Sequence, residues 1–299
     1  ASWARYIFGV CREMMALGVP VEGFNTAFAG DVPLGAGMSS SAALESTFAF
    51  GLNDLWGENK IDRMELARVG QRTEHKYIGV MCGIMDQAIS CLGRKGSLLR
   101  LDCRSGEYEY FPWNPKGYQL VLVNSCVKHT LAGSPYNERR LQCEHVAEII
   151  GQKHPEVKSL RDASIEMLEE VKGEITGDEY KRARYVIGEV ERVLAVCDAL
   201  KNDDYEMVGK MMYETHYGLS KEYEVSCEEL DFLNDVAKEA GVTGSRIMGG
   251  GFGGCTINLV AEELVDNFKK LAKEKFAEKY GKEPIIIDVV IGDGARKLC

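Results

Sequence analysis

The sequence predicts a mixed α and β protein with two domains. Its 299 residues suffice for two domains of about 150 residues each. Apolar residues at helical spacing alternate along the chain with short β-rich stretches, and glycine-rich loops occur at 30–42 and at 249–254. We therefore expect an N-terminal domain over residues 1–118 and a C-terminal domain over residues 119–299.

In the first domain, helices and strands are expected to alternate. The serines at 39–41 follow a glycine turn, where hydroxyl side chains could cap the next helix. Glu65 follows Asp62 by three residues, which is the spacing of a capping box. The expected elements are helices that end at Gly18, begin near residue 40 and run from 62 to 77, and strands at 24–29, 97–101 and 108–111.

The second domain is expected to combine a few strands with a long helix-rich region. Helical spacing of apolar residues recurs between the strand at 119–124 and the second glycine-rich loop, and this loop lies between two strand-like stretches. The expected elements are helices at 138–150, 165–172, 178–200 and 205–217, a helix that begins at Ser226, a strand, turn and strand over 245–260, a helix at 262–280 and a β-rich run at 285–291.

Composition and charge exclude several classes of protein. Lysine and arginine number 36 against 46 aspartates and glutamates, and the net charge of −10 repels nucleic acids and anionic membranes. No apolar run approaches the roughly 18 residues of a membrane-spanning helix, and no secretory signal opens the chain. The ten cysteines form no C-x-x-C pair. We expect a cytoplasmic protein with reduced thiols, small-molecule ligands and no nucleic-acid or membrane partner.

The first glycine-rich loop has the features of a phosphate-binding loop. Two glycines and three serines stand where a strand hands over to a helix, so free backbone amides could face an anion. The loop has no P-loop lysine, and Ser40 occupies the third glycine position of G-x-G-x-x-G. The alternative is a capped helix after a tight turn.

The second glycine-rich loop contains G-x-G-x-x-G at Gly249, Gly251 and Gly254, but a strand-like stretch follows where a dinucleotide-binding fold requires a helix. So many glycines favour a close approach of the backbone to a ligand or to another loop. A plain hairpin turn is the alternative.

Two acidic residues are candidates for chemistry. Asp86 stands among apolar neighbours, where a carboxylate is costly to bury without a partner. It could serve as a general base or an electrostatic anchor, and the alternatives are a helix N-cap or a salt bridge at the core edge. Glu74, on a predicted helix, could offer oxygen ligands to Mg²⁺, but taken alone it fits a solvated helix charge better.

Three segments together resemble the motifs of the GHMP small-molecule kinases, in the same order and at wide separation. Residues 33–42 resemble that family's phosphate loop, 82–87 its catalytic-aspartate segment, and 249–254 its third motif. The middle segment resembles the galactokinase branch in particular. The resemblance covers nearly the whole chain, and it implies a ribosomal-S5-like N-terminal part and a helix-rich, ferredoxin-like C-terminal part.

The resemblance implies an ATP-dependent sugar kinase that forms galactose 1-phosphate and ADP. Asp86 would be the base at the 1-hydroxyl of galactose, and Gly83 and Tyr136 would contact the sugar. Ser41 and Glu74 would be ligands of Mg²⁺. The nucleotide-binding residues would be Gly35, Ala36, Gly37, Met38, Ser39, Ser40 and Ser41, with a supporting glycine loop formed by Gly249, Gly250, Gly251, Gly253 and Gly254.

One motif of the family does not occur in this sequence. Galactokinases carry a sugar motif of the G-R-x-N-L-I-G-E-H-x-D-Y type ahead of the first helix, so we expect residues 1–299 by themselves to phosphorylate little or no galactose. Two other functions stay open, a non-catalytic sensor of galactose and ATP, and a kinase for a related sugar such as N-acetylgalactosamine. We assign the helices at 138–217 to a packed core and expect a monomer.

Overall fold

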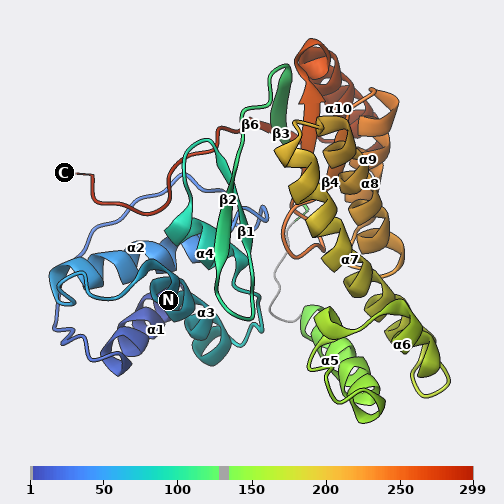
Figure 1. The fold of residues 1–299 in the computed structure, drawn as a ribbon. Helices are drawn as coiled ribbons and strands as arrows, with labels where there is room; N and C mark the ends of the chain where they lie inside the picture. Colours follow the sequence, from blue (N-terminus) through green and yellow to red (C-terminus); the bar gives the residue numbers. More distant parts are fainter. Residues whose placement is uncertain (1–2, 128–134, 299) are drawn as a thin grey trace. The chain divides into compact units, whose positions relative to one another are not determined.

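A computed structural model describes residues 3–127 and 135–298 (Figure 1). The chain forms two compact units, the first made of residues 1–114 and 290–299 and the second of residues 115–289. These units differ from the predicted domains, 1–118 and 119–299, because residues 290–299 group with the first unit. Within the described ranges, no helix has both the length and the apolar character that crossing a membrane requires.

The first unit is a cluster of helices with one hairpin. Its apolar core gathers residues of four helices, such as Met14, Leu52, Leu66 and Ala88. The Asp62 side chain caps its helix by accepting from the Glu65 amide at 3.0 Å, as the sequence predicts. The elements are α1 (Ala4–Ala16), α2 (Ser40–Leu55), α3 (Arg63–Thr73), the π-helical turn η1 (Glu74–Ile78), α4 (Met85–Leu92), and the antiparallel strands β1 (Ser97–Leu101) and β2 (Tyr108–Pro112).

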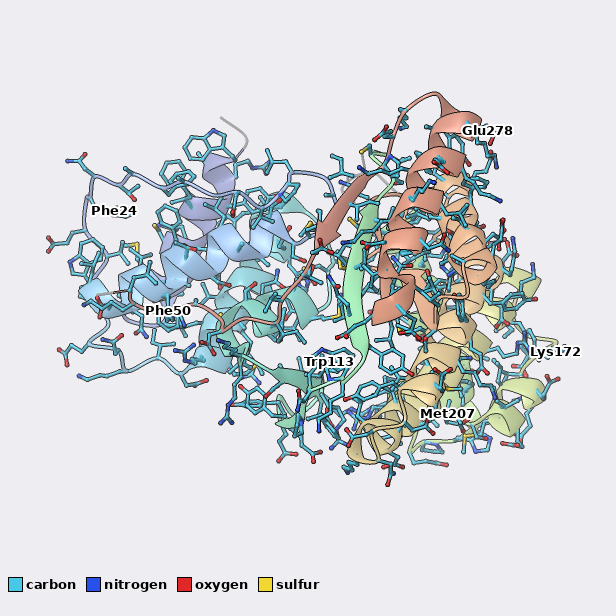
Figure 2. The ribbon with its side chains drawn as sticks, turned by 90° about the horizontal axis from the view of Figure 1, so that it is seen from above. Phe24, Phe50, Trp113, Lys172, Met207 and Glu278 are labelled. Carbon is cyan, nitrogen blue, oxygen red and sulfur yellow. The ribbon has the colours of Figure 1, made fainter. Side chains whose placement is uncertain are left out.

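The strand predicted at 24–29 is wrong. Residues 25–30 are exposed, and no described residue pairs with this segment, although a strand needs a neighbour to satisfy its backbone groups. Aromatic packing holds this segment, rather than the hydrogen bonds of a strand ladder. The ring centroid of Phe24, labelled in Figure 2, lies 5.8 Å from that of Trp56, and the ring centroid of Phe28 lies 5.6 Å from that of Phe48.

The last described residues run along the first unit. The Gly294 amide donates to the Gly93 carbonyl at 2.8 Å, and the Ala295 amide donates to the Ser90 carbonyl at 2.7 Å. A Cβ at Gly294 would lie 2.8 Å from the Ser90 carbonyl oxygen, so glycine is required for this approach. The β-rich run predicted at 285–291 is consequently shorter, because only β6 (Ile285–Asp288) pairs with a strand.

The second unit contains a four-stranded antiparallel sheet in the order β4-β5-β3-β6. Apolar residues of α9 and α10, such as Leu233 and Phe268, pack with Val121 and Val260 of the sheet. The elements of this core are β3 (Tyr118–Asn124), α9 (Glu228–Glu239), β4 (Gly244–Ile247), β5 (Cys255–Ala261), the 3-10 turn η3 (Glu262–Leu264), α10 (Val265–Tyr280) and β6. This order of strands and helices is ferredoxin-like, as the resemblance implies.

A helical insertion between β3 and α9 accounts for the helix-rich region that the sequence predicts. It has its own apolar core, which includes Ile150, Leu168 and Ile187. The Thr176 side chain and Glu179 form a capping box at the start of the longest helix. The elements are α5 (Tyr136–Lys153), the 3-10 turn η2 (Leu160–Asp162), α6 (Ile165–Glu170), α7 (Gly177–Lys201) and α8 (Tyr205–Lys221).

Candidate active site

The predicted phosphate loop adopts a conformation that leaves the start of α2 uncapped by its N-cap side chain. Gly35 and Gly37 have φ angles of 70° and 71°, and Ser39 has a φ of 58°, which is unfavourable for a residue with a Cβ. Ser39 is the N-cap of α2, but its side chain makes no capping hydrogen bond. The predicted capping is therefore wrong for Ser39. Its hydroxyl does not occupy the amides of the first turn, where a helix favours an anion.

The serines of this segment lie close to the two predicted acidic residues. Ser39 lies close enough to Asp86, and Ser41 close enough to Glu74, to lower the pKa of each carboxyl. The segment 33–42 and these acids are far apart in sequence, so the fold brings together four residues that the sequence singled out. Gly83 is exposed, and a Cβ there would meet nothing within 4 Å.

Glu74 is buried, so a solvated helix charge is the wrong interpretation of this residue. It begins the π-helical turn that extends α3, a distortion that is frequent at functional sites. The Gly79 and Val80 amides both donate to the Glu74 carbonyl. Burial raises the pKa of Glu74, and the nearby Asp86 charge raises it further, whereas the Ser41 hydrogen bond lowers it.

Asp86 stands in the first turn of α4 and is not its N-cap, which is Ile84. Among the described residues, no lysine or arginine forms an ion pair with it, so neither structural alternative from the sequence is observed. Burial raises the pKa of this carboxyl, and the Ser39 hydrogen bond lowers it in part. Gln71 and His75 contact the Cys82 carbonyl at 3.3 Å and 2.8 Å, which ties the segment before Asp86 to α3 and η1.

A third carboxyl, Glu45 on α2, belongs to the same cluster. It is 1% exposed, and burial together with the Glu74 charge raises its pKa to about 9. Glu45 was not among the predicted site residues, although its position in the sequence carries a signal. It lies on the buried face of α2 with Ala42, Ala49 and Leu52, at three-to-four spacing, so this acid interrupts an apolar stripe.

The second glycine-rich loop lies in the second unit and connects β4 to β5. The Phe252 amide donates to the Val225 carbonyl at 2.6 Å, and a Cβ at Gly251 would lie 2.8 Å from the Val225 Cβ and closer still to its carbonyl oxygen. The expected close backbone approach is therefore confirmed, and the second loop involved is the connection between α8 and α9. Gly249, Gly253 and Gly254 also have positive φ angles, whereas Gly250 does not.

Tyr136 is the first residue of α5, and the same helix contacts the α8–α9 connection. The Arg139 Nε donates to the Tyr223 carbonyl at 2.9 Å, and its Nη2 donates to the Glu224 carbonyl at 3.3 Å. The connection between α8 and α9 thus bonds both to the helix that starts at Tyr136 and, through Val225, to the glycine loop.

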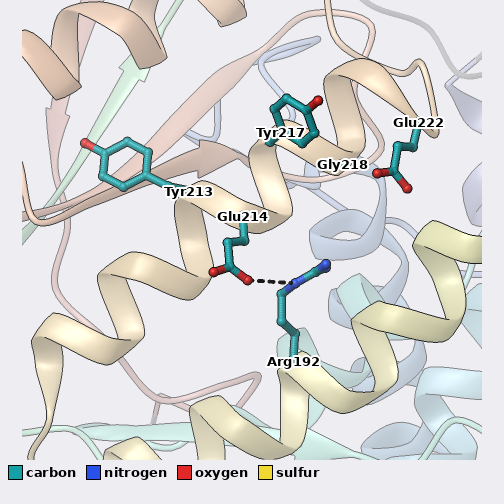
Figure 3. A pocket seen from close by; sticks show the side chains of 6 residues that line it. All are labelled: Arg192, Tyr213, Glu214, Tyr217, Gly218 and Glu222. Atoms are coloured by element: carbon teal, nitrogen blue, oxygen red, sulfur yellow. Dashed lines mark ion pairs between the residues drawn. The ribbon is translucent and has the colours of Figure 1, made fainter.

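A shallow pocket of about 300 Å³ also lies in the second unit, between α7 and α8 (Figure 3). Arg192 of α7 extends toward Glu214 of α8, and their charged atoms are 3.6 Å apart. None of the predicted site residues lines this pocket. The histidines and acids of the described residues form no cluster of three or more that could hold a metal ion.

Comparison with known proteins defines the class of this protein. The GHMP kinase N-terminal domain matches residues 5–94, and the GHMP kinase C-terminal domain matches residues 197–278. The chain is thus a kinase of the GHMP class, as its motifs indicated. A homoserine kinase from Cytophaga hutchinsonii shares the fold, with a TM-score of 0.65 at 16% identity.

Relatives of higher sequence identity show to which family within the GHMP class the chain belongs. The chain is 42% identical over 301 residues to a galactokinase of Clostridium acetobutylicum, with 99% of this chain and 77% of the relative covered. It is 38% identical to a galactokinase of Thermotoga maritima, with 99% and 82% covered. The crystal structure of Lactococcus lactis galactokinase complexed with galactose matches with a TM-score of 0.90 and 32% identity, over 99% of this chain and 76% of that one. The chain belongs to the galactokinase family.

Proposed function

We propose that this protein transfers the γ-phosphoryl group of ATP to the 1-hydroxyl of galactose and releases galactose 1-phosphate and ADP. The observation that carries the proposal is a pair of contacts, in which Ser39 lowers the pKa of Asp86 and Ser41 lowers the pKa of Glu74. They connect the candidate phosphate loop to the two carboxyls that are suited to bind Mg²⁺ and to accept the proton of the sugar hydroxyl. Galactose is supported as the sugar by the two galactokinase relatives and by the similar structure of a galactokinase complexed with galactose.

Residues 35–41 would hold the phosphates of ATP. The left-handed glycines turn the loop toward the start of α2, and the uncapped amides of that 16-residue helix provide donors for phosphate oxygens. The net charge of −10 does not oppose this binding, because local amides supply the positive end of the field.

Ser41 and Glu74 fit the role of ligands for Mg²⁺. Glu74 is buried near Asp86 and pairs with no lysine or arginine in the described part of the chain, so a cation would offset its burial cost. Mg²⁺ in kinases is commonly held by one or two protein groups and by the substrate phosphates, which agrees with the small donor set here. When bound, the ion would neutralise charge on the transferred phosphoryl group.

Asp86 would orient the 1-hydroxyl of galactose and accept its proton. As the hydroxyl oxygen bonds to the γ-phosphorus, the bond from that phosphorus to the β–γ bridging oxygen breaks, and the bonding pair leaves with ADP. Gly83 and Tyr136 would contact the sugar. Gly249, Gly250, Gly251, Gly253 and Gly254 would form the supporting glycine loop, and the Phe252 amide within it bonds to the α8–α9 connection.

The test is galactose-dependent release of ADP from Mg-ATP, with Asp86→Asn as the variant. Loss of the base should lower kcat by about 10²–10⁴-fold, whereas Asp235→Asn, a matched change at a largely exposed position, should leave it unchanged. Equal rates in wild type and Asp86→Asn would refute the assigned base. N-acetylgalactosamine, assayed in parallel, tests the choice of sugar.

The assay has two arms because the sequence predicts that residues 1–299 by themselves turn over little galactose. One arm uses this chain, and the other joins it to an N-terminal segment that carries the galactokinase sugar motif. Turnover in either arm that depends on Asp86 supports the kinase. Binding of galactose and ATP without turnover in both arms would support a sensor.

A further inference from the structure

The three helices that carry the candidate site of the first unit share one buried polar contact. Ser41 lies on α2, Glu74 continues α3 as the turn η1, and Asp86 lies on α4. The contact is a hydrogen bond from the Gln87 Nε2 of α4 to the Glu45 Oε2 of α2, at 3.2 Å.

The third helix takes part through Gly70 of α3. A Cβ at Gly70 would lie 2.8 Å from the Gln87 Cγ and 3.0 Å from the Glu45 Oε2. Gly70 has no positive φ angle, so its backbone conformation does not require glycine. The missing side chain is required because the contact between Glu45 and Gln87 occupies that space.

This contact is a poor source of stability. Glu45 and Gln87 are 1% and 3% exposed, and the Oε1 atom of each has no hydrogen-bond partner among the described residues. Buried polar atoms without partners oppose folding, and apolar side chains of similar size often replace such pairs without loss of stability. A directional contact at the meeting point of three helices has a different property, since it favours one relative placement of those helices.

We infer that Glu45 and Gln87 are positioning residues, whose contact across Gly70 fixes the placement of Ser41, Glu74 and Asp86 relative to one another. The inference rests on the proposed function. On two of the three helices, the residue that makes the contact is close in sequence to a residue of the site. Gln87 is the neighbour of Asp86, and Glu45 follows Ser41 by one helical turn.

The closing experiment uses the assay arm that turns over galactose and compares Glu45→Gln with the double variant Glu45→Leu, Gln87→Leu. The first keeps a neutral group with an acceptor oxygen, so its kcat should stay within about threefold of wild type. The second replaces the directional contact by apolar packing, so its melting temperature should match or exceed that of wild type, while kcat falls at least about tenfold. The cavity variant Leu52→Ala is the control, since it lowers the melting temperature without touching the contact.

A double variant that is folded and retains kcat within threefold would overturn the inference. If the double variant does not fold, Gly70→Ala decides, because it displaces the contact and leaves both partners in place. A tenfold fall of kcat in Gly70→Ala supports the inference, and an unchanged kcat overturns it.

A crystal structure of the double variant, or of Gly70→Ala if the double variant does not fold, gives a readout that does not depend on turnover. A change in the placement of Ser41, Glu74 and Asp86 relative to one another is expected. An unchanged placement of Ser41, Glu74 and Asp86 would overturn the inference even if the proposed reaction were wrong.

Discussion

Replacing Gly251 by alanine should destabilise the second unit more than its backbone angle alone explains. The φ of 84° would cost alanine about 1–2 kcal/mol. The new Cβ would also lie 2.8 Å from the Val225 Cβ and closer to the Val225 carbonyl, so the loop must move away. Moving it breaks the 2.6 Å hydrogen bond from the Phe252 amide and leaves a buried carbonyl unpaired, at a further cost of about 1–3 kcal/mol.

Gly281→Ala is the matched control for this prediction. Gly281 has a φ of 67°, but a Cβ there would meet nothing within 4 Å, so only the backbone cost applies. Urea unfolding and scanning calorimetry should give a difference of about 2 kcal/mol between the two variants, or about 4–8 °C in the melting temperature for a unit of this size. Equal losses in the two variants would show that the contact with Val225 contributes nothing.

Three other substitutions should change the dependence on pH. Ser39→Ala removes the hydroxyl that lowers the pKa of Asp86, so the acid limb of kcat/KM should move to higher pH; an unmoved limb contradicts that assignment. Glu45 has a raised pKa of about 9, so the folded state keeps a proton that the unfolded state loses, and stability should fall as the pH rises from about 4.5 toward 9. Glu45→Gln should reduce this fall, as urea unfolding at several pH values would show. The pKa of Asp231 is lowered by hydrogen bonds from His216, Ser226 and Ser220, although burial opposes the shift; its stabilisation is therefore present above the ordinary pKa and lost in acid. Asp231→Asn should flatten the acid side of the stability curve, and an unchanged curve would argue against the role of these bonds.

Helices with a regular apolar stripe were the elements that the sequence predicted best. The run at 178–200 became α7, and the turn between two strands at 245–260 became the β4–β5 connection. Both signals are local, since apolar spacing and glycine content can be read within one segment. The segment 24–29 has β-type residues but no paired neighbour among the described residues, and pairing cannot be read from the segment itself.

The candidate site was predictable in its residues but not in its contacts. The sequence indicated Ser41, Glu74 and Asp86 through their resemblance to family motifs, and it offered Ser39 as a nucleotide-binding residue or as a helix cap. In the structure Ser39 lies close to Asp86, 47 positions along the chain, and no local pattern specifies this proximity. Glu45 was missed for a related reason, because an acid on an apolar stripe shows its role only when the neighbouring helices are in place.

The return of residues 290–295 to the first unit has a consequence for the order of synthesis. The backbone bonds from Gly294 to Gly93 and from Ala295 to Ser90 join α4 and the residue that follows it to a segment made about 200 residues later. While a ribosome is still translating the second unit, α4 and Gly93 therefore each lack one of their eventual partners. The helix that carries Asp86 acquires its full set of backbone contacts only after residues 294 and 295 have been translated.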